Sequence, residues 1–456
     1  MKILLVNPPW YSEEGDISPT FSLGIAYIAA VLRENGHKVM LIDADAEGIS
    51  WKEFKKRLKN FSPDVLGITS TTSTYFSGIR AAQLGKEIGC FTVMGGPHVS
   101  AIPHESLAKS KYLDAVCRGE GEYTMLELVE KLENGKPLDD VKGLSFRKGR
   151  KIIHNLPREP IRNLDELPFP ARDLLPMKQK YRTLWGHPAG HIFSSRGCPN
   201  TCTFCASHLV FGKAVRFRSP ENVLDEIEEM VNRFGIKQFA FSDDTFTTWP
   251  RRVEQICDGI IERGLDVKWV CQARANTVNY GLLKKMKDAG CIQIDYGVES
   301  GDPEVLKKMK KNINHEQVKR AIRLTNLLGM KTFAYYIIGT PYDDLETTRK
   351  TINFAKKLGA SRSYFNILVP YPGTEIYNEA KANGTLLIED WSEFHQEKSI
   401  IKTKLPRWYI EKVYRRAKME LFLTEFFREV RHLRFREVWN DTKRGVNFLK
   451  RKIKIV

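Results

Sequence analysis

The feature that most constrains the fold of this chain is a regular alternation of short apolar segments and amphipathic segments in its first 140 residues. Strands are expected at 2–6, 38–42, 65–69, 91–94 and 115–118, and helices at 23–34, 51–60 and 79–88, with a last helix that ends at 132. This alternation with short loops predicts an α/β fold with a doubly wound, Rossmann-like parallel sheet. A ligand is expected at the carboxyl ends of the strands.

A second alternating series begins near residue 191. Strand-like segments occur at 192–194, 238–241, 268–272, 293–296, 331–338 and 363–368, with helical segments between them. Six β/α units in succession predict a partial (β/α)6 barrel of the TIM type, whose functional side chains lie on the loops that follow the strands. The polar and glycine positions at or just past these strand ends are Asp243, Asp244, Arg274, Glu299, Gly339 and Thr340.

Between the two series lies a stretch with prolines at 157, 160, 168, 170 and 176 and little periodicity, which indicates a wrapping linker. The predicted organisation is therefore a first domain at 1–142, a linker at 143–184, a barrel at 185–395 and a basic helical C-terminal segment at 396–456. Residues 407–456 contain 15 Lys or Arg and 6 Asp or Glu, so this segment carries about half of the +17 formal charge of the 456-residue chain.

Composition narrows the classes of protein. No apolar run approaches the roughly 18 residues of a membrane span, and the N-terminus lacks the longer apolar core of a secretory signal, so a cytoplasmic protein is predicted. Because the positive charge is concentrated in the tail, a general nucleic-acid binder is not favoured. The tail interleaves basic residues with Trp and Phe, a pattern that fits a membrane surface, RNA phosphates or a helix docked on the barrel.

The motif that carries chemistry is Arg196-Gly197-Cys198-Pro199-Asn200-Thr201-Cys202-Thr203-Phe204-Cys205, directly after the first barrel strand. The Cys-x3-Cys-x2-Cys spacing places three thiolates on one loop, and soft anionic thiolates suit iron–sulfur clusters. Three ligands hold three irons of a 4Fe–4S cluster and leave the fourth iron open. The alternative is a structural Cys3His zinc site, because His208 follows Cys205 by three residues.

Over residues 185–390 this sequence resembles the radical S-adenosylmethionine (SAM) superfamily. The resemblance implies that Cys198, Cys202 and Cys205 bind the cluster and that SAM is cleaved reductively to methionine and a 5′-deoxyadenosyl radical. It further implies that Phe204 packs beside the adenine, that Asp243 or Asp244 meets the amino group, and that Arg274 pairs with the methionyl carboxylate. Glu299 and Ser300 are expected at the ribose or amino group, and Gly339 and Thr340 on the adenine side.

The first domain resembles the cobalamin-binding domain that precedes the radical module in one large subfamily. The resemblance covers residues 1–140 and implies a corrin on the carboxyl edge of the sheet, with the nucleotide tail buried between strands. Where related domains have Asp-x-His-x-x-Gly, this chain has Asp43-Ala44-Asp45-Ala46-Glu47-Gly48, so no protein nitrogen is expected below the cobalt. The positions implied in binding are Asn7, Asp43, Asp45, Gly48, Ser70, Thr71, Thr72, Gly95, Gly96, His98, Gly119 and Glu120.

A scaffold that binds no cofactor, or a nucleotide site built on the glycines, remains an alternative for this domain. His98 and His104 are expected to be turn residues rather than ligands, since His98 follows Gly-Gly-Pro.

Together these resemblances imply a cobalamin-dependent radical SAM enzyme that methylates an unactivated carbon of a small molecule or lipid, or forms or oxidises a ring. A one-electron donor such as flavodoxin or ferredoxin is implied as a partner, and peripheral membrane association through 407–456 is a further expectation. The alternatives are an RNA-modifying enzyme of the methylthiotransferase type and a non-enzymatic zinc-stabilised binding protein. The substrate and the catalytic residues cannot be deduced from the motifs.

Overall fold

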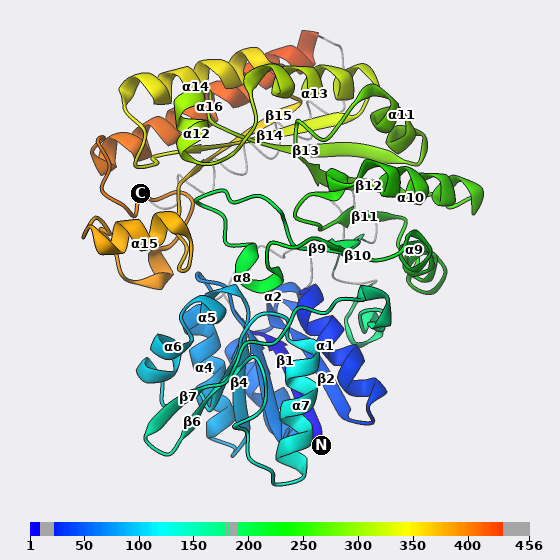
Figure 1. Ribbon diagram of the computed structural model, residues 1–456, viewed down its shortest axis with the longest axis vertical. Helices are drawn as coiled ribbons and strands as arrows, with labels where there is room; N and C mark the ends of the chain where they lie inside the picture. Colours follow the sequence, from blue (N-terminus) through cyan, green and yellow to red (C-terminus); the bar gives the residue numbers. More distant parts are fainter. Residues whose placement is uncertain (10–21, 178–180, 182–188, 432–456) are drawn as a thin grey trace.

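The described part of the chain forms two large sheets, one mainly parallel and one wholly parallel, and the carboxyl ends of their parallel strands face each other (Figure 1). The computed structural model describes residues 1–9, 22–177, 181 and 189–431. The first sheet, shown in blue and cyan, has the strand order β2-β1-β3-β4-β5-β6-β7, and its first five strands are parallel. Its strands are β1 (Lys2–Asn7), β2 (Lys38–Asp43), β3 (Val65–Thr69), β4 (Phe91–Gly95), β5 (Ala115–Cys117), β6 (Leu144–Lys148) and β7 (Lys151–His154).

Alternation within β1 shows why this sheet is covered on both faces. Ile3 and Leu5 enter a core that includes residues of α1 and α7, whereas Leu4 and Val6 enter a second core that includes residues of α3 and α4. The order 2-1-3-4-5 reverses between β1 and β3, and ligands bind at such a switch point. The helices are α1 (Leu23–Glu34), α2 (Ala44–Glu47), α3 (Trp51–Phe61), α4 (Tyr75–Lys86), α5 (Pro97–Ala101), α6 (Pro103–Lys109) and α7 (Glu122–Glu133).

The first sheet extends past the predicted domain boundary at 142. Strands β6 and β7 form an antiparallel hairpin that pairs with β5, so residues 144–154 belong to this sheet and not to the linker. The two strands are only five and four residues long, and they gain their pairing from the edge of β5, which the local sequence does not reveal. The rest of the linker wraps the molecule and contributes the buried side chains Ile161, Leu164, Leu167 and Leu175 to the core.

The second sheet is the predicted open barrel. Six parallel strands run in the order β15-β14-β13-β12-β11-β8, with a short antiparallel pair, β9 (Ser195–Arg196) and β10 (Arg216–Phe217), beside it. The strands are β8 (Ala189–Ile192), β11 (Gln238–Phe241), β12 (Lys268–Ala273), β13 (Cys291–Glu299), β14 (Lys331–Ile338) and β15 (Arg362–Ile367). The helices are α8 (His208–Phe211), α9 (Pro220–Phe234), α10 (Pro250–Glu262), α11 (Tyr280–Asp288), α12 (Pro303–Lys308), α13 (His315–Leu327), α14 (Leu345–Leu358) and α15 (Glu375–Ala382).

The segment after the barrel packs against both halves of the molecule. Trp391 and Phe394, in and just after the short 3-10 helix Trp391–Glu393, are buried in the core of the first domain. The last described helix, α16 (Arg407–Arg431), begins eleven residues after the predicted start of the C-terminal segment and docks on the barrel. It buries Ile410, Tyr414, Ala417 and Leu421, whose spacing marks one face. Residues 432–456 of the tail lie outside the described residues.

Candidate active site

A glycine-lined cavity lies at the carboxyl edge of the first sheet, and Val210 and Phe211 of the barrel helix α8 line it. Figure 1 shows α8 between this sheet and the barrel. The space open to the centre of a water molecule is about 110 Å³. A Cβ on Gly121 would come within 2.7 Å of the Ile28 side chain. The glycines therefore keep room that other residues would fill. They are Gly24, Gly67, Gly95, Gly96, Gly119 and Gly121.

This cavity fits the narrow tail of a cofactor such as cobalamin. Its walls are mainly apolar side chains and bare backbone, and Gly96 has a positive φ of 108° and lies so close to Ser70 that any Cβ would collide with the Ser70 carbonyl. Only glycine is compatible with that backbone conformation and that contact. Of the glycines predicted from sequence, Gly95, Gly96 and Gly119 line the cavity; Gly48 ends α2 as an exposed left-handed cap.

The polar residues predicted at this edge are largely engaged with one another. Asp43, which is 1% exposed, accepts hydrogen bonds from Asn7 Nδ2 at 2.8 Å and from the Tyr181 hydroxyl at 2.8 Å. Asp45 is half-buried, and burial raises the pKa of its carboxyl, with a further contribution from Asp43. The absence of a protein nitrogen below the cobalt stays a prediction.

The hydroxyl loop after β3 is held mainly by its own contacts. The Ser70 hydroxyl donates to the Thr71 carbonyl at 3.0 Å, and the amide of Thr71 donates to the Thr74 hydroxyl at 2.9 Å. Thr72 Oγ1 lies 3.1 Å from His98 Nδ1. The His98 ring packs against Tyr75 and Trp391, and burial lowers the pKa of its imidazole to about 4. His98 is thus a neutral ring at the seam with the C-terminal segment. His104 lies elsewhere, with Nδ1 3.1 Å from His154 Nε2.

Glu120 joins the two halves of the molecule through a buried ionic network. Arg196 donates to Glu120 and Glu122 at 2.7 Å each, and Arg216 donates to Glu120 at 2.7 Å. All four side chains are at most 10% exposed. Glu120 therefore lines the cavity as a partner of two barrel arginines, a role that the motif did not reveal because the partners lie about 75 and 95 residues away.

The cysteine loop follows β9, two residues after Arg196. The amide of Thr203 donates to the Met309 carbonyl, and the amide of Ile376 donates to the Thr203 carbonyl, so the loop is anchored between α12 and α15. All three thiols are free and partly exposed, and burial raises the pKa of Cys205 to about 11. In the described part of the chain the three side chains do not converge on one point as a metal site. The donor set nevertheless suits an iron–sulfur cluster, because all three donors are thiols on one loop.

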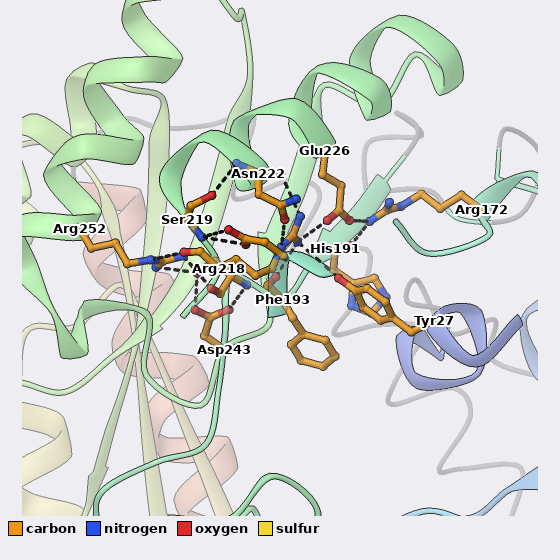
Figure 2. A network of polar contacts seen from close by, with 12 residues as sticks. Tyr27, Arg172, His191, Phe193, Arg218, Ser219, Asn222, Glu226, Asp243 and Arg252 are labelled. Carbon is orange, nitrogen blue, oxygen red and sulfur yellow. Dashed lines mark hydrogen bonds and ion pairs between the residues drawn. The ribbon is translucent and has the colours of Figure 1, made fainter. Parts of the chain in front are cut away.

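The structure separates the two neighbouring aspartates after β11. Asp243 is 1% exposed and accepts from the Ser194 amide at 2.7 Å and from the Ser195 hydroxyl at 2.7 Å, within a network of polar contacts that includes Arg252 (Figure 2). Within the described residues, one carboxyl oxygen of Asp244 is buried and makes no hydrogen bond. Burial raises the pKa of this carboxyl, and the nearby Ser207 hydroxyl lowers it by a smaller amount. Asp244, not Asp243, is therefore available to a ligand.

Arg274, Glu299 and Lys311 meet beside the cysteine loop. Arg274 Nη1 lies 4.0 Å from the Cys202 sulfur, and its other terminal nitrogen donates to the Lys311 carbonyl. Lys311 Nζ pairs with Glu299 at 2.6 Å. Glu299 has φ +64°, a left-handed conformation at the bulged end of β13 that is uncommon outside glycine and costs about 1–3 kcal/mol. Sequence reasoning missed Lys311, which has no motif of its own.

Other predicted SAM positions are built into turns or packing. The Ser300 hydroxyl lies 3.1 Å from Thr351 Oγ1 and accepts from the Asp302 amide. Thr340 donates from its amide and hydroxyl to Asp343, and Gly339 has φ +73°. Phe204 packs against a small apolar cluster of Leu368, Ile376, Ala380 and Ile401.

Comparison with known proteins assigns each half of the molecule to a family. Residues 192–355 match the model of the radical SAM superfamily, and residues 18–129 match that of the B12 binding domain. An uncharacterized methyltransferase of Pyrococcus horikoshii is 39% identical over 428 residues, which cover 93% of this chain and 93% of that protein. The chain belongs to the cobalamin-binding radical SAM enzyme family. It is therefore an enzyme, and its family uses a 4Fe–4S cluster, SAM and cobalamin.

Two further relatives of this radical SAM enzyme show the range of the family. An anaerobic magnesium-protoporphyrin IX monomethyl ester cyclase of Rubrivivax gelatinosus is 28% identical and covers 83% of this chain and 70% of its own. The solved structure of TsrM, a radical SAM methyltransferase of Kitasatospora setae with cobalamin and a [4Fe-4S] cluster bound, superimposes with a TM-score of 0.72 at 18% identity, covering 93% of this chain and 88% of that chain. The latter shows that the fold is shared.

Proposed function

We propose that this enzyme transfers a methyl group to an unactivated carbon of an organic substrate. The observation that carries the proposal is that the glycine-lined cavity and the cysteine loop are joined by one residue: Arg196 lines the cavity, pairs with Glu120 and Glu122, and precedes Cys198 by two positions. When bound, the cluster and cobalamin supply one-electron cleavage of SAM and a cobalt-carried methyl group. The protein must hold both cofactors at one substrate, and a residue shared by the cavity and the cysteine loop supports this proposal.

The residues of the barrel edge have distinct proposed roles. Cys198, Cys202 and Cys205 bind the cluster, and the Arg274 guanidinium beside Cys202 offsets its negative charge. Asp244 accepts from the ammonium group of SAM, because a buried carboxyl oxygen without a partner is costly unless a ligand supplies one.

Of the remaining predicted SAM positions, Phe204 alone contacts SAM in this proposal. Glu299 with Lys311 fixes the end of β13 beside the SAM site, and Phe204 forms the apolar wall for the adenine. Asp243, Ser300, Gly339 and Thr340 shape the loops and do not contact SAM.

In the first domain the cavity would hold the nucleotide tail of cobalamin, with the Ser70–Thr72 loop and Gly95, Gly96 and Gly119 around it. Asn7, Asp43 and Tyr181 form a buried hydrogen-bonded base for the edge on which the corrin rests. Asp45 leaves the lower face of the cobalt without a protein nitrogen.

The test uses full-length enzyme purified and reconstituted without oxygen, with SAM labelled in its methyl group and a flavodoxin or ferredoxin as electron donor. A methyltransferase forms 5′-deoxyadenosine, and forms S-adenosylhomocysteine only when cobalamin is present. Both products are measured by mass spectrometry. Formation of 5′-deoxyadenosine with no S-adenosylhomocysteine would instead support ring formation or oxidation, the activity class of the cyclase relative.

A lipid surface is the second proposed partner, and α16 carries the observation that favours it. No helix of the described residues is long and apolar enough to cross a membrane. The outer face of α16 nevertheless exposes Trp408 (62%), Met419 (46%) and Leu423 (44%), with Lys412 and Arg415 between them at helical spacing. Exposed aromatic and basic residues on one face suit an anionic membrane interface.

Co-sedimentation with liposomes of phosphatidylglycerol and phosphatidylcholine tests this surface. Replacing Trp408, Met419 and Leu423 together by Ser should lower binding at least fivefold without unfolding, because none of the three is buried. Leu327→Ser, which changes an exposed leucine on α13, is the matched control. Equal binding of both variants would refute the membrane partner.

A further inference from the structure

The inner wall of the barrel carries a polar and aromatic patch that neither the cofactors nor the cysteine loop uses. Along β13, Ile294, Tyr296 and Val298 are buried toward the helices, and Tyr296 Oη lies 2.9 Å from Thr325 Oγ1 of α13. Because side chains alternate along a strand, Gln293, Asp295 and Gly297 face the inside of the barrel.

The neighbouring strands continue this patch. Parallel pairing aligns Gln272 of β12 with Asp295, and Tyr335 of β14 with both Gly297 and Tyr364 of β15. Gln272 is exposed and Tyr364 is 42% exposed, so the patch is accessible to a small molecule.

Three charged residues lie on the aligned rows of this patch, namely Asp295, Lys331 beside Gln293 and Arg362 beside Phe333. Within the described residues, Asp295 has no ion-pair partner. Its carboxylate accepts from Gln293 Nε2 at 2.8 Å and from the Tyr335 hydroxyl at 3.3 Å, both neutral groups. Burial raises the pKa of this carboxyl to about 6, yet at neutral pH it still carries its charge. A partly buried carboxylate is stabilised when an opposite charge approaches it.

Two tyrosine rings frame the same carboxylate. The rings of Tyr335 and Tyr364 are stacked, with centroids 5.3 Å apart and an angle of 19° between their planes, and Phe333 lies 5.5 Å from Tyr364. The face of an aromatic ring attracts cations, and a carboxylate beside ring faces is a common arrangement for an ammonium group. The charge of Asp295 and the geometry of the rings thus both favour a ligand with an ammonium group.

The patch also lies next to the proposed SAM site. Gly297, two residues beyond Asp295 on the same face, is so close to the Glu299–Lys311 pair that a Cβ there would collide with both side chains. The Lys311 carbonyl in turn accepts from Arg274, which reaches Cys202. A molecule held at Asp295 would therefore lie two residues along β13 from the contacts that lead through Lys311 and Arg274 to Cys202.

We propose that this patch is the substrate-orienting surface and that the substrate carries a protonated amine, which pairs with Asp295 beside the rings of Tyr335 and Tyr364. The inference rests on the proposed function, in that it assigns the bound molecule to the reaction at the cluster. It narrows the substrate from any organic molecule or lipid to one with an ammonium group.

The experiment compares benzylamine with benzyl alcohol, a neutral probe of nearly the same size, on reconstituted full-length enzyme. Dissociation constants at pH 7.5 are measured by ligand-observed saturation-transfer NMR. Benzylamine should bind at least tenfold more tightly than benzyl alcohol. Asp295→Asn, which keeps the shape but removes the charge, should abolish this difference. Tyr364→Ala should weaken benzylamine about threefold, the size of an exposed cation–π contact.

Matched controls separate charge from folding. Asp266→Asn changes an exposed carboxylate that pairs with Lys237 on the outside of the barrel, and it should leave the preference for benzylamine intact. Iron content and circular dichroism of Asp295→Asn should equal those of the native chain. If the two probes bind equally, or if Asp295→Asn keeps the preference, the amine-binding patch is refuted.

The outcome is independent of the test of the proposed function, because no turnover is needed to measure binding. If the native enzyme fails to cleave SAM while the Asp295-dependent preference for benzylamine persists, the proposed methyl transfer fails and the amine site stands. If SAM is cleaved and no preference exists, the amine site alone fails.

Discussion

The carboxyl edges of the two sheets face each other, and they differ in which features could bind a cofactor. At the first edge the predicted polar groups are already paired: Asp43 with Asn7 and Tyr181, Glu120 with Arg196 and Arg216. What remains is space, kept open by glycines. At the barrel edge, within the described residues, three thiols form no disulfide and one Asp244 oxygen makes no hydrogen bond. The first edge therefore suits recognition of a cofactor by its shape, whereas the barrel edge suits recognition through the chemistry of its donor atoms.

The largest effect should come from removing the donor atoms of the barrel edge. Replacing Cys198, Cys202 and Cys205 together by Ala should reduce iron from about four atoms per chain to none, since thiolates are the cluster ligands. Cobalamin binding should persist, because the cavity lies in the other half. Iron analysis and visible absorbance give the answer. Cys90→Ala, at a buried cysteine of the first domain, should retain all iron. Full iron content in the triple variant would show that the cluster is held elsewhere.

The next effect concerns the link between the edges. Arg196→Met leaves Glu122 buried without its cation, and breaking a buried pair in this way costs about 3–5 kcal/mol of unfolding free energy. Urea unfolding followed by circular dichroism measures it. Lys284→Met, which breaks an exposed pair with Asp288, should leave the free energy of unfolding almost unchanged. A similar small loss for both variants would mean that the two halves are not joined through Arg196.

The shape of the first edge is tested by a size series at Gly24, where an added Cβ meets no atom within 4 Å. Gly24→Leu should fill the cavity and weaken binding of hydroxocobalamin at least tenfold, about 1.4 kcal/mol. Gly24→Ala should bind nearly as well as the native chain. Both variants should be at least as stable as the native chain, because glycine disfavours a helix by about 1 kcal/mol. Equilibrium dialysis measures the affinity. Undiminished affinity in Gly24→Leu would place cobalamin outside this cavity.

The smallest effect is the pH dependence of folding stability that comes from His98, where the first domain packs against Trp391. Burial lowers the pKa of folded His98 from 6.5 to about 4, so the unfolded chain takes up the proton first as the pH falls. The stability contributed by neutral His98 is complete above pH 6.5 and is lost as the pH falls toward 4, by about 1 kcal/mol between pH 6.5 and 5.5. His98→Gln should flatten this part of the stability profile in urea unfolding. An unchanged slope would show that another group is responsible.

Much of the architecture could be predicted because it depends on local periodicity. The helix at 23–34 and the strand at 65–69 lie where the pattern placed them, and all six barrel strands are present. The hairpin of β6 and β7 was missed, since its short strands are stabilised by pairing with a distant edge. The basic tail fits a membrane surface, RNA phosphates or a helix docked on the barrel by its pattern alone. The structure shows that one face of residues 410–421 docks on the barrel.

The sequence by itself determined which residues are chemically able to act, because thiols at fixed spacing and glycines after strands are local properties of the chain. Tertiary structure decided which of them remain available. Asp243 and Asp244 are adjacent in sequence, yet Ser194 and Ser195, almost fifty residues away, bind the first. Within the described residues, one oxygen of the second makes no hydrogen bond. Likewise, Lys311 and Asp295 acquire their roles only from what the fold places around them, since the free energy of a buried charge depends on its neighbours and not on its motif.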